Sequence, residues 1–239
     1  MQTYQAFFKI NLKSESFSLE GKKCLLLAPH PDDESIGAGG TLALYTEKFS
    51  VACLTNGNKG IRETLPKQAE VIREKEFRSV MGLLKVPEVF WLNIEDNHLM
   101  DGYEVFQQLD LSPYDVIFLP NLLDQHPDHK AVSCLLHRYF KQYPHRAKAG
   151  LQLAFYEVWG ALPLPNAFVD ISSVVELKRS MINAHLSQVE KKDFASMILA
   201  LNQYRGLNRG VFSAEAFCVM GLSLFFQLVE SLAFCEFVS

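Results

Sequence analysis

The sequence predicts an α/β fold: a doubly wound, mostly parallel sheet flanked by helices, in a single domain. Short apolar runs of strand length recur along the chain, and segments with helical periodicity separate them, which is the order expected of βαβ units. The chain has 239 residues, of which 49% are hydrophobic, and this is enough to bury one full core. We find no internal repeat, low-complexity tract or linker that would divide the chain.

Five apolar runs are the expected strands of this sheet: residues 23–28, 50–55, 88–92, 115–120 and 153–158. The expected helices cover residues 41–48, 66–84, 128–140, 173–186 and 194–205. Segment 66–84 has the clearest helical pattern, because its apolar residues form one stripe opposite its charges and Pro66 suits a first helical turn. We therefore interpret the fold as Rossmann-like, and such sheets bind ligands at the carboxyl ends of their strands.

The charge balance and the cysteines restrict the class of protein. The 23 basic and 27 acidic residues give a net charge of -4 without any basic block, so we expect no nucleic-acid partner. The five cysteines, at positions 24, 53, 134, 218 and 235, form no C-x-x-C pair and lie inside apolar runs. They are typical of buried thiols in a reducing compartment. Together with an N-terminus that lacks a secretion signal, they indicate a cytoplasmic protein.

An apolar segment closes the chain. The longest uncharged stretch, residues 216–229, is shorter than the roughly 20 apolar residues that cross a bilayer, so we expect no membrane span. We expect the apolar extension at residues 218–239 to lie in the core or at a subunit interface, which allows for a homo-oligomer.

A cluster of histidine and carboxylate residues follows each of two expected strands. Residues 30–34 read His-Pro-Asp-Asp-Glu and follow the run 23–28, while residues 124–129 read Asp-Gln-His-Pro-Asp-His and follow the run 115–120. Carboxylates this close together repel one another and lose hydration unless a cation or a helix N-terminus compensates. One cluster alone could be plain helix capping. Two clusters at two strand ends indicate a metal site.

The residue types suit a catalytic zinc, which takes three protein ligands and keeps one position open. His30 and Asp33 can converge on one ion if the chain turns into a helix between them, and His129 would complete the set from the other loop. Asp32 would then be free to act as general base, taking the proton of an attacking water whose acidity zinc raises.

The remaining residues of the two clusters have supporting roles in this interpretation. His126 could donate a hydrogen bond, as imidazolium, to the oxyanion that forms when water attacks a carbonyl. Asp128 would either orient and charge that imidazole or support a metal ligand from behind, and we expect Glu34 and Asp124 to support the metal ligands in the latter way. Gly37 to Gly40 lack the third glycine of a dinucleotide loop and are better explained by close helix packing. Four other histidines have no partner at ligand spacing and are interpreted as structural: His98, His137, His145 and His185.

These motifs resemble the PIG-L/LmbE-type zinc deacetylases, which carry A-H-P-D-D-E after the first strand and H-P-D-H at the second half of the site. Here Pro29 is inserted between Ala28 and His30, and residues 126–129 match the second motif intact. The resemblance covers about residues 23–217. It includes Thr55-Asn56-Gly57, Arg73-x-x-Glu76, Asp96-x-x-Leu99, Tyr156-Glu157 and His185-x-Ser187-Gln188.

The resemblance implies a reaction as well as a fold. Members of this family hydrolyse the N-acetyl group of compounds that contain N-acetylglucosamine (GlcNAc). By position, it implies zinc bound by His30, Asp33 and His129, with Asp32 as the base that later returns its proton to the leaving amine. It implies that His126 stabilises the oxyanion and that two further residues, Arg62 and Asp96, contact the sugar.

The leading expectation is therefore a zinc-dependent N-deacetylase of a small amino-sugar conjugate, with residues 1–239 as one deacetylase domain. One alternative keeps the zinc and changes the substrate to a non-sugar amide or a phosphoester, although phosphoester hydrolysis usually takes two metals. The other is a sugar-binding protein of the same fold without turnover. Asp32 argues against that alternative, because a protein that only binds needs no general base.

Overall fold

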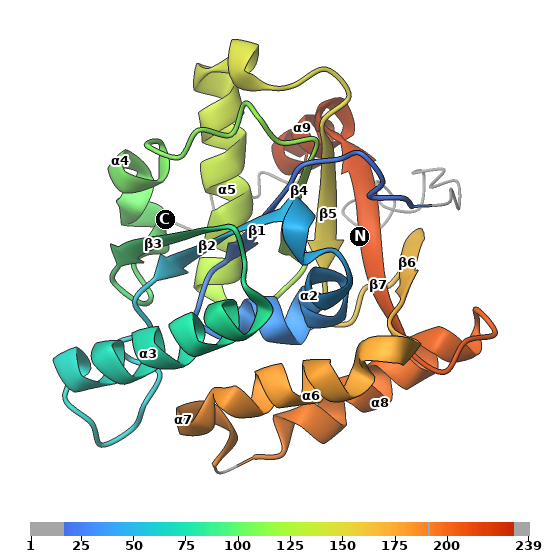
Figure 1. The fold of residues 1–239 in the computed structure, drawn as a ribbon. Helices are drawn as coiled ribbons and strands as arrows, with labels where there is room; N and C mark the ends of the chain where they lie inside the picture. Colours follow the sequence, from blue (N-terminus) through green and yellow to red (C-terminus); the bar gives the residue numbers. More distant parts are fainter. Residues whose placement is uncertain (1–16, 191, 232–239) are drawn as a thin grey trace.

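The structure, a computed structural model, describes residues 17–190 and 192–231. A seven-stranded sheet with the order β3-β2-β1-β4-β5-β7-β6 forms its centre, and helices cover both faces (Figure 1). The strands are β1 (Cys24–Ala28), β2 (Phe49–Thr55), β3 (Glu88–Ile94), β4 (Val116–Pro120), β5 (Gln152–Tyr156), β6 (Ala167–Asp170) and β7 (Ala214–Gly221). Strands β1 to β5 pair in parallel, whereas β7 runs antiparallel to both β5 and β6.

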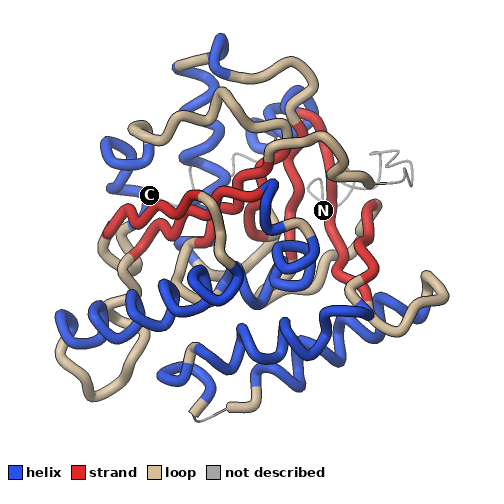
Figure 2. Tube along the Cα trace, viewed as in Figure 1, coloured by secondary structure: helices blue, strands red, loops and turns tan. Residues whose placement is uncertain are grey.

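The α-helices are α2 (Asp33–Leu44), α3 (Pro66–Leu84), α4 (Tyr103–Phe106), α5 (Pro127–Gln142), α6 (Val175–Ala184), α7 (Leu186–Val189), α8 (Phe194–Leu207) and α9 (Leu222–Ser231). Short 3-10 helices lie at Thr46–Lys48, Leu99–Gly102, Pro144–Arg146 and Ser172–Val174. The tube in Figure 2 shows that helices and strands alternate through most of the chain. The predicted α/β class and the mostly parallel sheet are confirmed.

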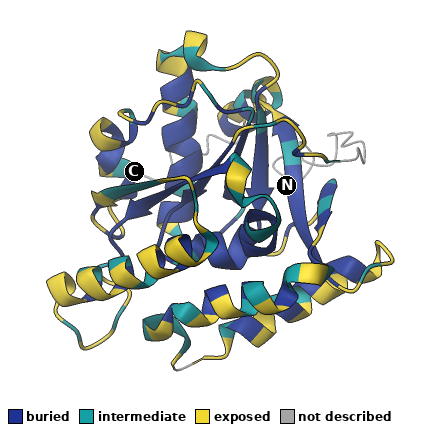
Figure 3. Cartoon of the chain, viewed as in Figure 1, coloured by how far each residue is buried: buried dark blue, intermediate teal, exposed yellow. Residues whose placement is uncertain are grey.

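All five predicted strands are present, with ends within two residues of those expected. Their apolar runs are continuous because they are buried on both faces: in β1, Leu25 and Leu27 join the core under α4, α5 and α9, whereas Leu26 joins the core under α2, α3 and α6. Figure 3 shows this as a buried sheet between helices whose outer sides are exposed. The prediction missed β6, which is short, and β7, whose apolar run continues into α9 without a periodicity that separates strand from helix.

The helix after β1 begins at Asp33, earlier than the predicted start at residue 41. The sequence did not predict a helix over residues 33–40 because glycine is a poor helix former. These glycines are required by packing. A Cβ at Gly37 would lie 2.1 Å from a ring carbon of Tyr156, and one at Gly40 would lie 2.6 Å from Ile171. The expected close packing of this glycine segment is therefore confirmed, and it brings Asp33 directly onto the end of the sheet.

A buried ion pair fixes the second half of α2, which is kinked at Ala38. The carboxylate of Glu215 on β7 accepts hydrogen bonds from the backbone N–H groups of Gly40 (2.7 Å) and Thr41 (2.8 Å). It also forms an ion pair with Lys178 on α6, at 2.6 Å. Both charged side chains are almost fully buried. The pair therefore ties α2, α6 and β7 together behind residues 30–34.

The apolar end of the chain is partly core. Helix α9 buries Phe225, Leu228 and Val229 beside α5, while residues 232–239 lie outside the part that the structure describes. None of the helices in the described ranges has both the length and the apolarity that a bilayer span requires.

Replacing Lys178 by methionine should destabilise the fold strongly, because Glu215 would remain buried without its counter-charge. We expect a loss of about 3 kcal/mol in the free energy of unfolding, measured by urea denaturation. The matched control is Arg78→Met, which removes the exposed pair between Arg78 and Glu74 and should cost less than about 1 kcal/mol. Equal losses in the two variants would contradict the structural role of Lys178.

Candidate active site

The loops after β1 and β4 meet at the point where the strand order reverses. Strand β1 pairs with β2 on one side and with β4 on the other, and this arrangement opens a crevice at the carboxyl ends of the strands. The ring centroid of His30, after β1, lies 4.6 Å from that of His126 and 5.4 Å from that of His129, both after β4. The two predicted clusters therefore form one site.

Three donor atoms form a nearly equilateral triangle in this crevice. Nδ1 of His30 lies 3.2 Å from Oδ2 of Asp33 and 3.3 Å from Nε2 of His129, and the last two atoms are 3.2 Å apart. A tetrahedral ion with bonds of about 2.0 Å holds its ligand atoms about 3.3 Å apart, so the buried triangle fits a zinc-sized cation. Two further groups that share His30 have potential ligand atoms within 4.8 Å of one another. They are His30, His126 and His129, and His30, Asp96 and Asp128.

Carboxylates support both imidazoles of the triangle from the side away from it. Nε2 of His30 lies 3.0 Å from Asp128 and 3.2 Å from Asp96, while Nδ1 of His129 lies 3.2 Å from Asp124. At His30 these hydrogen bonds place the ring proton on Nε2 and leave Nδ1 free for a metal. At His129 the nearby carboxylate of Asp124 favours the same arrangement, although Nδ1 makes no aligned hydrogen bond to it. Asp124 thus lies where expected. Of the two roles that the sequence allowed for Asp128, its carboxylate has the second, because it supports His30 and not the ring of His126.

The electrostatics of the triangle depend on these contacts. Burial acts to raise the pKa of Asp33, but His129 and His30 hold that pKa well below its usual value. Burial also opposes protonation of His129, yet Asp33 and Asp124 raise its pKa to about 9. In the metal-free protein His129 therefore carries a proton at neutral pH, and a cation that binds there must displace it.

Asp32 stands apart from the triangle. It precedes α2 with φ 153° and ψ -24°, a backbone conformation that persists only where the surroundings enforce it. Its carboxylate lies 3.1 Å from the guanidinium of Arg73, and its backbone N–H donates to Glu34 at 3.1 Å. Burial raises the pKa of Asp32 to about 6, with Arg73 acting in the opposite direction.

Arg73 is a site residue to which the sequence interpretation gave no role. It is 3% exposed and donates to the backbone carbonyl of Pro31 at 2.9 Å. It also crosses the loop after β2 so closely that a Cβ at Gly60 would lie 2.3 Å from its Nη1. The signal was present in the pattern, because Arg73 falls on the buried stripe of α3 between Ala69 and Phe77. A charged residue on an apolar stripe calls for a buried partner.

His126 has one ring nitrogen committed to the backbone. The N–H of Asp128 donates to Nδ1 of His126 at 3.2 Å, at the start of α5. Burial, together with nearby His30 and His129, lowers the pKa of His126. The neutral ring therefore keeps its proton on Nε2, so His126 is a neutral donor where the sequence interpretation expected an imidazolium.

Three other residues are placed differently from their sequence interpretation. Arg62 is exposed and is absent from the lining of the crevice. Asp96 lines the crevice, but its carboxylate is held by His30 and by the backbone N–H of Lys59 at 3.3 Å. His185, interpreted as a histidine without a partner, is buried, and its Nε2 lies 3.1 Å from Glu34. Residues 34 and 185 are too far apart in the sequence for spacing to reveal this pair.

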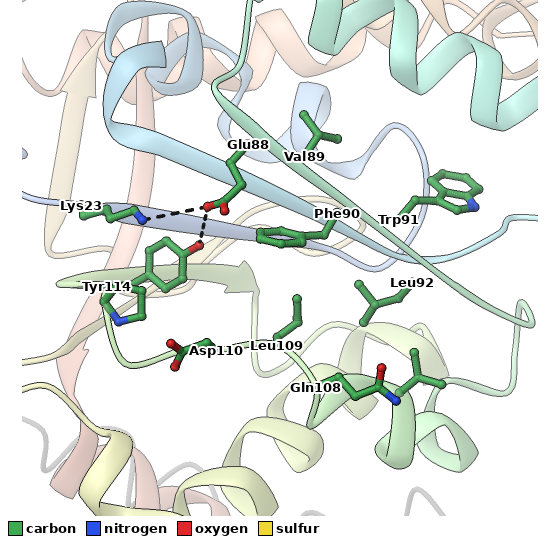
Figure 4. Close-up of a pocket in the computed structure, with 12 residues that line it drawn as sticks. Lys23, Glu88, Val89, Phe90, Trp91, Leu92, Gln108, Leu109, Asp110 and Tyr114 are labelled. Carbon is green, nitrogen blue, oxygen red and sulfur yellow. Dashed lines mark hydrogen bonds and ion pairs between the residues drawn. The ribbon is translucent and has the colours of Figure 1, made fainter.

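The crevice has a volume of about 230 Å³, and besides the two clusters Lys59, Asn97, Trp159 and Gln188 line it. A larger cleft of about 720 Å³ lies at the other ends of β3 and β4 (Figure 4). There Glu88 accepts from Tyr114 at 3.2 Å and lies 3.9 Å from Lys23. The lining of this cleft contains no histidine or cysteine, so the smaller crevice is the better candidate for chemistry.

Known proteins are similar to this chain in both sequence and fold. Residues 25–140 match the PIG-L family, described as GlcNAc-PI de-N-acetylase. A probable N-acetyl-alpha-D-glucosaminyl L-malate deacetylase 2 from Bacillus cereus is 28% identical over 70% of this chain and 83% of its own. The diacetylchitobiose deacetylase of Thermococcus kodakarensis is 29% identical over 76% of this chain and 74% of its own.

A solved structure agrees with these sequence matches. The N,N'-diacetylchitobiose deacetylase from Pyrococcus horikoshii superposes with a TM-score of 0.76, at 25% identity and 92% coverage of both chains. The matched region contains the strands, loops and histidines that build the crevice. The chain is therefore similar to the PIG-L (LmbE-like) deacetylases, in sequence over residues 25–140 and in fold over most of its length.

Proposed function

We propose that this protein is a zinc-dependent hydrolase that removes the N-acetyl group from a GlcNAc-containing small molecule. The observation that carries the proposal is the donor triangle of His30, Asp33 and His129. The carboxylate of Asp32 is adjacent to this triangle but is not one of its donors, because it pairs with Arg73. The relatives named above are deacetylases of GlcNAc conjugates, which supports the same reaction for this chain.

Two imidazoles and one carboxylate are a common ligand set of catalytic zinc and leave one position open. Zinc bound there would polarise the substrate carbonyl and make the attacking water more acidic. Asp96, Asp124 and Asp128 hold the two imidazoles in the orientation that this binding needs.

The chain's own residues handle the proton and the developing charge. With a pKa of about 6, Asp32 is ionised at neutral pH and takes the proton of the water that attacks the N-acetyl carbonyl. Arg73 keeps this carboxylate ionised and fixes its position. Nε2–H of His126 donates to the oxyanion. Asp32 then returns its proton to the amine as the C–N bond breaks, which yields acetate and a free amino sugar.

Metal content and acetate release test these roles separately. We expect about one zinc per chain in the wild type, and loss of that zinc in His129→Ala. Asp32→Asn is the matched variant: it should retain the zinc and release acetate about 10²- to 10⁴-fold more slowly. Both quantities can be measured on the same preparations, by elemental analysis and an acetate assay. Loss of zinc from Asp32→Asn would mean that the roles of the two aspartates are reversed.

The pH dependence of kcat/KM should report Asp32. Because the base must be ionised, activity should rise with pH through a value near 6. Arg73→Gln removes the nearby positive charge and should move this acidic limb to higher pH, whereas Arg73→Lys should leave it nearly in place. Arg78→Gln, an exposed substitution on the same helix, is the control. An acidic limb unaffected by Arg73→Gln would rule out Asp32 as the titrating base.

We also propose that the protein forms a homodimer through the α8 stripe, which we define as Met197, Ala200, Tyr204 and Leu207. All four are exposed, and Leu207 is 75% exposed. Their spacing places them on one side of α8, opposite buried Ala195 and Leu199. An exposed, uncharged stripe on one side of a helix supports the proposal of a protein interface here. In an antiparallel two-fold pairing the stripe faces itself, with Met197 opposite Tyr204 and small Ala200 at the crossing point.

Light scattering tests this pairing. The wild type should be a dimer at micromolar concentration, and Ala200→Glu should be monomeric, because it places two charges at the crossing point. Leu83→Glu, at an exposed leucine of α3, should remain dimeric. A monomeric wild type, or a dimer that survives Ala200→Glu, would contradict the proposed interface.

A further inference from the structure

We infer that the group attached to the N-acetylated sugar is itself a neutral saccharide, and that it stacks on Trp159 at the rim of the crevice. This inference rests on the deacetylase activity proposed above and names its substrate class. The related enzymes leave the question open, since one is named for a malate conjugate, which is anionic, and another for a neutral disaccharide.

The size of the crevice places part of the substrate outside it. Its volume of about 230 Å³ is below the range of about 300–1,000 Å³ that encloses a drug-sized ligand. One sugar ring with its N-acetyl group near the donor triangle would fill this space. The second group of a conjugate must therefore lie across the rim, against the residues that are both exposed and part of the lining.

Trp159 is the large apolar side chain at that rim. It follows β5, lines the crevice and is 55% exposed. Its backbone N–H donates to Asp124 at 3.2 Å, so it is anchored to the carboxylate that supports His129. Its ring packs edge-to-face on Phe194 of α8, with centroids 5.7 Å apart. A tryptophan fixed in this way offers a rigid apolar surface at little cost in side-chain entropy.

Contacts with Glu157 and with Arg205 of α8 also fix the loop that carries Trp159. Glu157 accepts the N–H of Leu162 at 2.7 Å and forms a buried ion pair with Arg205 of α8. Arg205 donates in addition to the carbonyl of Leu162 at 2.8 Å. These contacts close the loop between residues 157 and 162 on itself, so that the position of Trp159 is set before a substrate binds.

The charges of the lining favour a neutral group. Lys59 and Arg73 are the lysine and arginine among the lining residues of the described chain, and both are engaged. Nζ of Lys59 lies 3.1 Å from Glu95, and Arg73 is buried against Asp32. The carboxylates of Asp32, Asp33 and Asp96 face the same crevice. With zinc held by Asp33 and the imidazoles, Asp32 and Asp96 still face the crevice. Lys59 at its rim is already paired with Glu95, so a carboxylate-bearing conjugate would meet charges of its own sign.

The polar groups of the rim suit hydroxyl groups. Asn97 and Gln188 are among the lining residues, and an amide side chain carries both a donor and an acceptor. Nε2 of Gln188 donates to Ser187 at 3.0 Å, which leaves its carbonyl oxygen as the group for a substrate hydroxyl. An apolar platform with nearby amides is the combination expected for a sugar ring, which presents C–H groups on its faces and hydroxyls around its edge.

Steady-state kinetics with three substrates test the inference. The wild type should deacetylate N,N'-diacetylchitobiose with at least a roughly tenfold higher kcat/KM than N-acetylglucosaminyl malate. Trp159→Ala should lower kcat/KM for the disaccharide about 10- to 100-fold, mainly through KM, because a binding contact outside the reacting centre is lost. The rate with free GlcNAc should change little, and Trp159→Phe should retain most of the disaccharide activity. Lys192→Gln, near Phe194 but outside the lining, is the matched control and should behave as wild type.

Fluorescence gives a readout that does not depend on turnover. The chain has two tryptophans, so Trp91→Phe leaves Trp159 as the sole indole. In the inactive Asp32→Asn background, diacetylchitobiose should shift the emission of Trp159 and N-acetylglucosaminyl malate should not. Preference for the malate conjugate, or equal losses for disaccharide and GlcNAc in Trp159→Ala, would overturn the inference while leaving the deacetylase proposal intact. Absence of acetate from all three substrates with zinc-loaded wild type would overturn the proposed function instead.

Discussion

The pairing of β1 with β4 is the constraint on which the rest of the site depends. In this register Cys24 lies beside Val116 and Leu26 beside Phe118, so the two strands end at the same level and their loops can share one ion. A slip of one residue would displace one loop by about 3.3 Å along the strand, which is the full length of an edge of the donor triangle. The long apolar runs of both strands therefore contribute to the chemistry, because burial on both faces specifies their register.

The same convergence creates an imbalance of charge that protons on the imidazoles or a bound cation would reduce. Asp33, Asp96, Asp124 and Asp128 are all buried around the imidazoles of His30 and His129. Even with both imidazoles protonated, the carboxylates outnumber the positive charges at this point. Buried charge without compensation is costly. A divalent ion in the donor triangle would supply two positive charges in place of the two imidazole protons that it displaces. Stability and metal binding are in this way coupled through the same six side chains.

The sequence predicted those parts of the molecule that depend on local pattern. Five strands, four of the helices and both ligand clusters follow from apolar periodicity and motif spacing, and the family resemblance assigned Asp32 and Asp33 different roles. The missed features depend on tertiary contact. Glu34 meets His185 only because α2 packs against the end of α6. Which imidazole Asp128 supports depends in the same way on the pairing of β1 with β4. Arg73 is the intermediate case. Its place on the buried stripe of α3 predicts a buried partner, but the sequence does not identify that partner as Asp32.

Helix α8 links the two surfaces for which we propose partners. Its first residue, Phe194, supports Trp159 at the rim, and its buried Arg205 closes the loop that carries this tryptophan. Its outer side is the α8 stripe. In the antiparallel pairing proposed above, residue 194 of one copy lies opposite the partner's Leu207, so that dimer formation would cover the outer side of the aromatic pair. If both proposals hold, a second copy of the chain would stiffen the aromatic surface on which we propose that the substrate stacks.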